Sequence, residues 1–300
     1  MLAAHPGPPG RLIDIGGRRL HVVESGSGPV SVVLESGAGG WSSHWCEVAP
    51  LLSSRARVIA YDRAGLGWSD PASGSRDAGH IVEDLDRLLA ALGIDGPLVL
   101  VGHSLGGSFV RLATAQLGER VVGVVFVDAW HESVEEWEAR TGHRVGMPAW
   151  LTTAYGWMGK LGVLGLLARV GTIPPSPWPI DAETWRDIHV VSASRRQCIG
   201  TEREDRGLPV GDRLVSAVTR IAAPIRVLVA RESMPADEAP PGFPAGEYNA
   251  TWLAAADKLA ALSPSAQITV LDDSDHMIPF RRPDTVAAAV EQLLSLAAKR

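Results

Sequence analysis

The pentapeptide Gly102-His103-Ser104-Leu105-Gly106 is the part of this chain whose residue types and spacing most clearly suggest chemistry. It matches G-x-S-x-G, a pattern that places a serine on a sharp turn between a strand and a helix. The apolar residues 97–101 before it predict a strand buried on both faces, and residues 104–118 read as a helix. In so tight a turn, a Cβ at either glycine would collide with a neighbouring strand or helix. The pattern therefore predicts a nucleophilic Ser104 on strained backbone; the alternative is an ordinary glycine-rich turn.

Two further side chains could activate this serine. Asp128 directly follows the apolar segment 121–127, and His276 follows the segment 268–271. Both segments read as strands, and strand ends meet at one edge of an α/β sheet. A serine hydroxyl is a weak nucleophile until an imidazole takes its proton, and that imidazole needs a carboxylate at its other nitrogen. The order Ser104, Asp128, His276 along the chain is one of three known for such triads.

The acid of this predicted triad has an alternative. Glu232 lies just after the predicted strand 224–230, at the start of a long proline-rich loop. Asp128 instead lies at the end of a buried strand, where a carboxylate is held rigidly enough to orient an imidazole. We therefore favour Asp128 and keep Glu232 as the alternative acid. If Asp128 only capped the first turn of the segment that follows, its contribution would be about 1 kcal/mol.

The elements that must position these residues alternate along the chain. A hairpin is expected over residues 11–24. Strands are then predicted at 30–34, 57–61, 97–101, 121–127, 224–230 and 268–271, and those at 30–34, 97–101 and 121–127 are expected to be buried. Helices are predicted over about 43–53, 77–92, 104–118, 249–262 and 283–299. Such strand–helix alternation predicts an α/β fold: a mostly parallel sheet with helices on both faces.

The alternation stops between residues 131 and 220, which divides the chain into predicted domains. We expect residues 1–10 to be a flexible leader, 11–130 and 221–300 to form the α/β core, and 131–220 to form a helical cap over the sheet edge. The cap segment carries five of the ten tryptophans, and an apolar wall is how small-molecule sites are built. We assign substrate binding to Trp41, Trp130 and Trp157, although most cap tryptophans are expected to pack within the cap.

Composition restricts the partners. The net charge of −6 gives no basic footprint for nucleic acid, and no apolar run is long enough to span a membrane. The first ten residues lack the features of a signal peptide. Cys46 and Cys198 match no metal spacing and read as reduced thiols, which is typical of a cytoplasmic protein. We expect a small-molecule substrate and no metal, cofactor, nucleic-acid or membrane partner, and leave a homodimer open.

At this point the sequence resembles the α/β-hydrolase superfamily over about residues 11–299. The resemblance rests on Gly-His-Ser-Leu-Gly-Gly at 102–107, Tyr-Asp-Arg-Ala-Gly-Leu-Gly-Trp-Ser at 61–69 and Ser-Asp-His-Met-Ile-Pro at 274–279. Val-Asp-Ala-Trp-His-Glu at 127–132 and Leu-Ala-Ala-Leu-Ser-Pro at 259–264 are also similar to a bacterial branch of esterase-like hydrolases. The resemblance implies the α/β-hydrolase fold.

It also implies roles for individual residues. Ser104 would be the nucleophile and His276 the base, and the N–H groups of Ala38 and Leu105 would form the oxyanion hole. Asp275 stands where relatives usually have glycine. Dehalogenases and epoxide hydrolases of this fold attack with an aspartate at the position of Ser104, so this serine argues against both.

Other polar residues of these motifs have a structural interpretation. We expect Asp62 and Arg63 to form a buried pair that shapes the edge of their loop.

Together these features predict a serine hydrolase that cleaves an ester, thioester or lactone of a fairly apolar small molecule. The first alternative is a biosynthetic cyclase or acyl transferase, as in secondary metabolism, that passes the acyl group to an internal acceptor instead of water. The second is a ligand receptor that retains the triad without catalysis. The fold alone does not name the substrate, because cap and pocket decide it.

Overall fold

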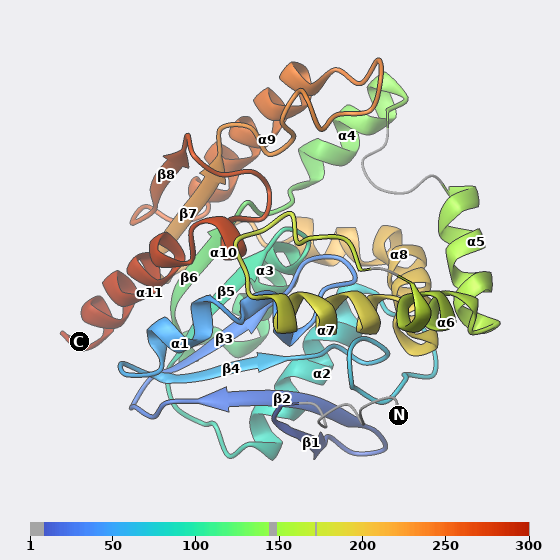
Figure 1. Cartoon of the computed structure of the whole chain (residues 1–300). Coiled ribbons are helices and arrows are strands. Elements are labelled where there is room, and N and C mark those ends of the chain that lie inside the picture. The colour runs from blue at the N-terminus through green and yellow to red at the C-terminus, as the bar shows by residue number, and fades with distance from the viewer. Residues whose placement is uncertain (1–8, 144–148, 172, 300) are drawn as a thin grey trace.

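The computed structural model describes residues 9–143, 149–171 and 173–299, and within them eight strands form one sheet. Their order across the sheet is β1-β2-β4-β3-β5-β6-β7-β8 (Figure 1). β2 pairs antiparallel with β1 and β4, and every other pairing is parallel. The strands are β1 (Arg11–Asp14), β2 (Arg19–Ser25), β3 (Ser31–Glu35), β4 (Arg57–Tyr61), β5 (Leu98–His103), β6 (Val121–Val127), β7 (Ile225–Ala230) and β8 (Gln267–Leu271). The predicted hairpin and mostly parallel sheet are confirmed.

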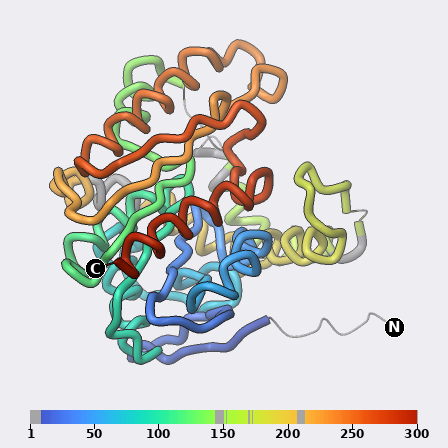
Figure 2. The backbone as a smooth tube through the Cα atoms, turned by 90° about the vertical axis from the view of Figure 1, so that its left-hand side faces the viewer, coloured from blue at the N-terminus to red at the C-terminus, as the bar shows by residue number. Residues whose placement is uncertain are grey.

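Helices cover both faces of this sheet. On one face α2 (Ala78–Ala91), α3 (Gly106–Leu117) and α9 (Ala245–Ala260) pack against alternate strand residues such as Val33 and Leu100. On the other face α1 (Val48–Leu52) and α11 (Pro283–Ala297) pack against the intervening residues, such as Leu34 and Val101. Figure 2 shows α9 and α11 on opposite sides of β7 and β8. Because both faces are covered, the central strands are apolar along their whole length.

The helix expected over residues 43–53 is instead two short pieces. A 3-10 turn, η1 (Ser42–Trp45), precedes α1, and residues 46 and 47 separate them. Pro50 explains the break, because it has no N–H to donate to the carbonyl four residues earlier and its ring crowds that position. Two further short elements, η2 (Gly118–Arg120) and α10 (Ile278–Arg281), were not expected.

The segment between β6 and β7 is helical where the structure describes it. It contains α4 (Glu132–Thr141), α5 (Ala149–Lys160), α6 (Val163–Val170), α7 (Ala182–Ser192) and α8 (Arg195–Ser216). α4 packs on α9, since Val134 and Trp137 share a cluster with Tyr248 and Trp252. α5 to α8 lie together on another side of the molecule (Figure 1), where α8 also contacts α2 and α3.

Some expectations fall on residues outside this description. Residues 1–8 of the expected leader and residues 144–148 and 172 of the expected cap are among them. In the part of the chain that is described, none of the helices combines the length and apolar character needed to cross a bilayer.

Candidate active site

Ser104 lies on the turn between β5 and α3, with φ of +52°. This left-handed backbone is strained for a residue other than glycine, and it is held from both sides. The N–H of Ser104 donates to the Val127 carbonyl at 3.0 Å, and its own carbonyl accepts from Gly107 and Trp130, both at 2.9 Å. The expected strained serine is therefore present.

The two glycines of the motif are required by close contacts. A Cβ on Gly102 would lie 2.5 Å from the Gly106 carbonyl oxygen, and one on Gly106 would lie 2.4 Å from that of Glu35. Gly107, the next residue, would place a Cβ 2.4 Å from that of Ala129. The sequence-based explanation of these glycines as sites of close approach is confirmed.

Asp128 and His276 come together at the same edge of the sheet. The Asp128 Oδ2 lies 2.7 Å from His276 Nδ1, and Oδ1 accepts the Ala230 N–H at 2.9 Å. Asp128 is fully buried and, like Ser104, has a positive φ, +40°. His276 Nε2 is thus the ring nitrogen left free for other chemistry. No hydrogen bond joins Ser104 Oγ to His276 among the described residues; such bonds are often long without substrate.

The structure separates the other carboxylates from His276. Glu232 is exposed on the loop after β7, and no contact between it and His276 occurs in the described chain. Asp275, although adjacent in sequence, accepts from the Met277 N–H at 2.8 Å and from Arg281 Nε at 3.0 Å. Geometry therefore favours Asp128 over Glu232 as the partner of His276.

Aromatic rings surround His276. Trp252 of α9 meets its ring edge to face at a centroid distance of 5.2 Å, and His103 lies 4.8 Å away on another side. His103 Nε2 also lies 2.8 Å from the His276 carbonyl oxygen and can donate to it. Burial, with a smaller contribution from His276, lowers the pKa of His103 well below its usual value. A neutral His103 therefore helps to fix the backbone of His276.

The loop after β3, which carries Ala38, passes close to Ser104. A Cβ on Gly37 would lie 3.0 Å from the Ser104 Cβ, so this loop passes directly beside the serine. Neither the Ala38 N–H nor the Leu105 N–H has an acceptor among the described residues. Free amides beside a nucleophile are what an oxyanion hole requires. The structure thus brings the loop that carries Ala38 beside Ser104, and the role of Ala38 and Leu105 as oxyanion donors stays a prediction.

A buried ion network holds this loop in place. Arg63 donates to the carbonyls of Ser36 at 2.7 Å and Gly37 at 2.6 Å. Its guanidinium also pairs with Glu35 at 2.6 Å and with Glu204 of α8 at 2.7 Å, and all three charged side chains are buried. Burial raises the pKa of Glu35, although Arg63 and the Tyr61 hydroxyl, which donates to Glu35, oppose that shift.

Helix α8 contributes a second residue to the same loop. Glu204 accepts from the Gly39 N–H at 2.8 Å, and the Gln197 side-chain amide donates to the Gly39 carbonyl. The Gln197 carbonyl oxygen accepts from Gly67 at 2.7 Å. Residues of the segment expected to be a cap therefore hydrogen-bond to the backbone of Gly39, next to Ala38.

The expected pair of Asp62 and Arg63 is wrong. Both are buried, but each side chain has its own hydrogen-bond partners, so the two do not pair with each other. Asp62 accepts from the amides of Ser42 at 2.9 Å and Trp68 at 2.8 Å and lies 2.9 Å from His21 Nδ1. Asp62 thus joins two loops, while Arg63 serves the network above.

The three tryptophans assigned to substrate lie in different surroundings. Trp41 is buried and packs with Ile188 of α7 and with Phe280. Trp130 is partly buried beside the α4–α9 cluster, and its N–H binds the Ser104 carbonyl. Trp157 is 59% exposed on α5 with Lys160 over its ring. The structure brings Trp130 beside the serine and does not bring Trp157 together with it.

Sequence reasoning missed Trp252, Glu204 and Gln197. Trp252 falls within the predicted helix 249–262, but nothing in the local sequence indicates that this helix packs against His276. Glu204 lies in a strongly charged helix, where a carboxylate that turns inward looks like its solvated neighbours. In the described chain, no group of three or more His, Cys, Asp or Glu residues is arranged to hold a metal ion.

Comparison with known proteins agrees with this fold. Residues 30–157 match the family model described as alpha/beta hydrolase fold. The solved structure of the epoxide hydrolase CorEH superposes with a TM-score of 0.67 at 19% identity, over 96% of this chain and 98% of that one. An esterase from Exiguobacterium antarcticum gives 0.65 at 18% identity, over 95% and 99%. Residues 30–157 thus resemble the alpha/beta hydrolase family, and the chain has the α/β-hydrolase fold that its motifs predict.

Curated relatives match only in part. A 2-(acetamidomethylene)succinate hydrolase from Mesorhizobium japonicum is 36% identical over 121 residues, which are 39% of this chain and 42% of that protein. Across eight such relatives the matched segments cover between 15% and 42% of the relative's length. Several of these relatives carry names of hydrolases.

Proposed function

We propose that this chain is a serine hydrolase that cleaves an ester, thioester or lactone of a fairly apolar small molecule. The observation that carries the proposal is the contact between the buried Asp128 and His276 Nδ1, made at the strand edge that also carries the strained Ser104. A buried carboxylate on one imidazole nitrogen fixes the tautomer that leaves Nε2 free as a base. If Asp128 had only a structural role, its hydrogen bond from the Ala230 N–H would suffice, and the contact with His276 would not be required.

The proposed mechanism is acyl transfer through a covalent intermediate. His276 Nε2 takes the Ser104 proton as Oγ attacks the substrate carbonyl, and the oxyanion accepts hydrogen bonds from the Ala38 and Leu105 N–H groups. Collapse of this intermediate expels the alcohol, thiol or ring oxygen, which receives the proton from His276. Water then attacks the acyl-enzyme by the same route and frees the acid. Asp128 stabilises the imidazolium formed at each step.

The preference for an apolar substrate has its own support. The Trp252 ring packs against His276, and Trp130 packs against the cluster that contains Trp252. The ring of Trp178 packs on Phe280, four residues beyond His276, at a centroid distance of 4.9 Å. Aromatic walls with few polar groups are typical of small-molecule sites. We propose that residues 131–220 act as the cap of this site, with α7 and α8 as the helices that touch the core loops.

Labelling and product analysis test this function. A fluorophosphonate probe should modify the wild-type chain at Ser104, and aryl esters of acetate, butyrate and octanoate should be hydrolysed. Turnover in water enriched in oxygen-18 should place the heavy oxygen in the released acid. Modification by the fluorophosphonate without oxygen-18 in the product would instead favour an internal acceptor, as in a cyclase. Absence of fluorophosphonate modification would favour a receptor.

A further inference from the structure

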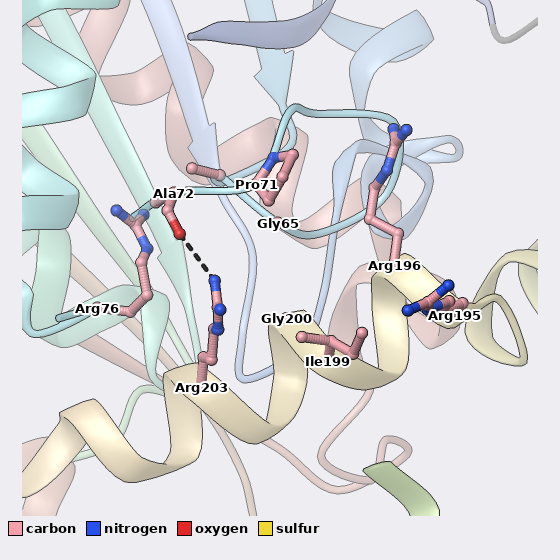
Figure 3. Close-up of a pocket in the computed structure, with 10 residues that line it drawn as sticks. Gly65, Pro71, Ala72, Arg76, Arg195, Arg196, Ile199, Gly200 and Arg203 are labelled. Carbon is pink, nitrogen blue, oxygen red and sulfur yellow. Dashed lines mark hydrogen bonds between the residues drawn. The ribbon is translucent and has the colours of Figure 1, made fainter. Parts of the chain in front are cut away.

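A cavity lined by four arginines lies between helix α8 and the loop after β4 (Figure 3). Its volume is about 350 Å³, within the range of small-molecule sites. Neither the candidate triad nor the expected oxyanion hole contributes to it. The lining residues are Ala64, Gly65, Pro71, Ala72, Arg76, Arg195, Arg196, Ile199, Gly200 and Arg203.

Two of the arginines are fixed in place by backbone carbonyls. Arg203 Nη1 donates to the Ala72 carbonyl at 2.8 Å, and Arg196 Nη1 donates to the Trp68 carbonyl at 2.7 Å. Figure 3 shows Arg203 reaching from α8 to Ala72, with Arg76 beside it. Each of these bonds uses one of the five N–H donors of a guanidinium, so the others stay available to a ligand.

The charge of this cavity is not neutralised by its own lining. No acidic residue lines it within the described chain. Arg76, which is 4% exposed, pairs with Asp84 at 3.0 Å, but that carboxylate is shared with Arg18. The Nη2 of Arg76 is buried and has no hydrogen-bond partner among the described residues. A buried donor without an acceptor is costly, which leaves this guanidinium suited to an added anion.

The floor of the cavity is apolar. Ala64, Ala72, Pro71 and Ile199 supply it, and Gly200 of α8 approaches the Gly65 backbone so closely that a Cβ there would lie 2.1 Å from the Gly65 oxygen. This seam joins α8 to the loop of residues 62–70. An occupant would therefore have an apolar body on the floor and an anionic group among the guanidiniums.

We propose that this cavity is a binding site for a small organic anion, with its phosphate or carboxylate group held by Arg76 and Arg203 and with Arg195 and Arg196 adding positive charge to the same lining. Guanidinium groups bind both oxyanions through paired, charge-assisted hydrogen bonds. The bound anion bridges the loop after β4 to α8, and α8 on its other side holds Gly39 through Glu204. The site is independent of the proposed ester chemistry and does not use Ser104.

Calorimetric titration with phenyl phosphate tests the site, because this probe combines an apolar ring with a phosphate. The wild-type chain should bind it saturably, and binding should weaken as salt rises. Inorganic phosphate should bind more weakly, and benzyl alcohol, which lacks the charge, should not bind. Phenylacetate tests the carboxylate source of the same chemistry and should compete with phenyl phosphate.

Variants locate the site. The double variant Arg196→Gln/Arg203→Gln should weaken binding at least tenfold, which corresponds to about 1.4 kcal/mol. Arg206→Gln, on the same helix but outside the cavity, and Ser104→Ala should bind like wild type. If the double variant does not fold, Arg195→Gln removes an exposed arginine and should weaken binding several-fold. Absence of binding to wild type, binding that survives these cavity variants, or loss of binding in Ser104→Ala would each overturn the proposal.

Discussion

The Gly39 N–H donates to Glu204 Oε2 at 2.8 Å, which joins the loop after β3 to helix α8 across 165 residues of sequence. The same carboxylate pairs with Arg63, whose guanidinium holds the carbonyls of Ser36 and Gly37. Both ends of the loop that carries Ala38 are thus fixed by one buried network. This arrangement makes the position of the proposed oxyanion donor depend on a residue from the segment proposed to be a cap.

Glu204→Gln should lower kcat about ten- to a hundredfold with a smaller change in KM. The substitution removes one of the two carboxylates on Arg63 and loosens the loop, whereas loss of an oxyanion donor itself costs about 10²–10³-fold. Steady-state kinetics on an aryl ester would measure the effect. Glu202→Gln is the matched control, because Glu202 is also buried on α8 but pairs with Lys160 and Arg206. Equal losses in the two variants would show that α8 acts only through stability.

Asp128→Asn should reduce turnover by about 10⁴-fold while the chain stays folded, as in other triads. The amide can no longer hold His276 in the required tautomer. Glu232→Gln should change turnover little, since Glu232 is exposed and makes no contact with His276 among the described residues. Circular dichroism would confirm that both variants fold. The opposite ranking of the two would assign the acid role to Glu232.

Gly106→Ala should destabilise the fold by about 3 kcal/mol, since the new Cβ would meet the Glu35 carbonyl oxygen at 2.4 Å and force backbone to move. Urea unfolding measures the change. Gly246→Ala serves as the control, because that glycine lies in α9 with no heavy atom within 4 Å of the added Cβ. It should be neutral or stabilising by up to about 1 kcal/mol. A well-tolerated Gly106→Ala would contradict the close approach of α3 to β3.

Stability should fall as the pH falls from about 6.5 towards 4. Burial, and next the charge of Arg63, lower the pKa of His44 to about 4, whereas an unfolded histidine titrates near 6.5. The unfolded chain therefore binds more protons in this window, so the free energy of unfolding decreases as the pH falls. His103 acts in the same direction. At pH 5 the His44→Gln variant should take up about one proton fewer on unfolding than wild type. The slope of the free energy of unfolding against pH measures this number. An unchanged slope would show that His44 is protonated in the folded chain.

Much of the fold could be read from local sequence. Strands such as β5 and β6 are buried on both faces and so appear as continuous apolar runs, and the glycines around Ser104 mark its turn. Because parallel strands end at one edge, the same pattern also predicted that Ser104, Asp128 and His276 would lie near each other. Their catalytic roles remain predictions.

Other features depend on contacts that no local pattern encodes. Arg63 finds Glu204 at a sequence separation of 141, and nothing in α8 distinguishes the inward Glu204 from the exposed Asp205. The adjacency of Asp62 and Arg63 suggested a pair, but each side chain hydrogen-bonds to other partners instead. The assignment of Trp157 to the substrate site rests on its residue type alone. Its exposure depends on how α5 packs on α8, and the apolar residues of α5 are not patterned strongly enough to predict which face packs.

Ser104→Ala tests the central claim most directly. The hydroxyl is the proposed nucleophile and makes no hydrogen bond within the described chain that the fold would lose, so the variant should keep the wild-type unfolding midpoint. It should lose fluorophosphonate labelling and at least about 10³-fold of kcat on the ester that wild type turns over best. A folded Ser104→Ala chain that hydrolyses this ester at near wild-type rate would contradict a covalent mechanism at this serine.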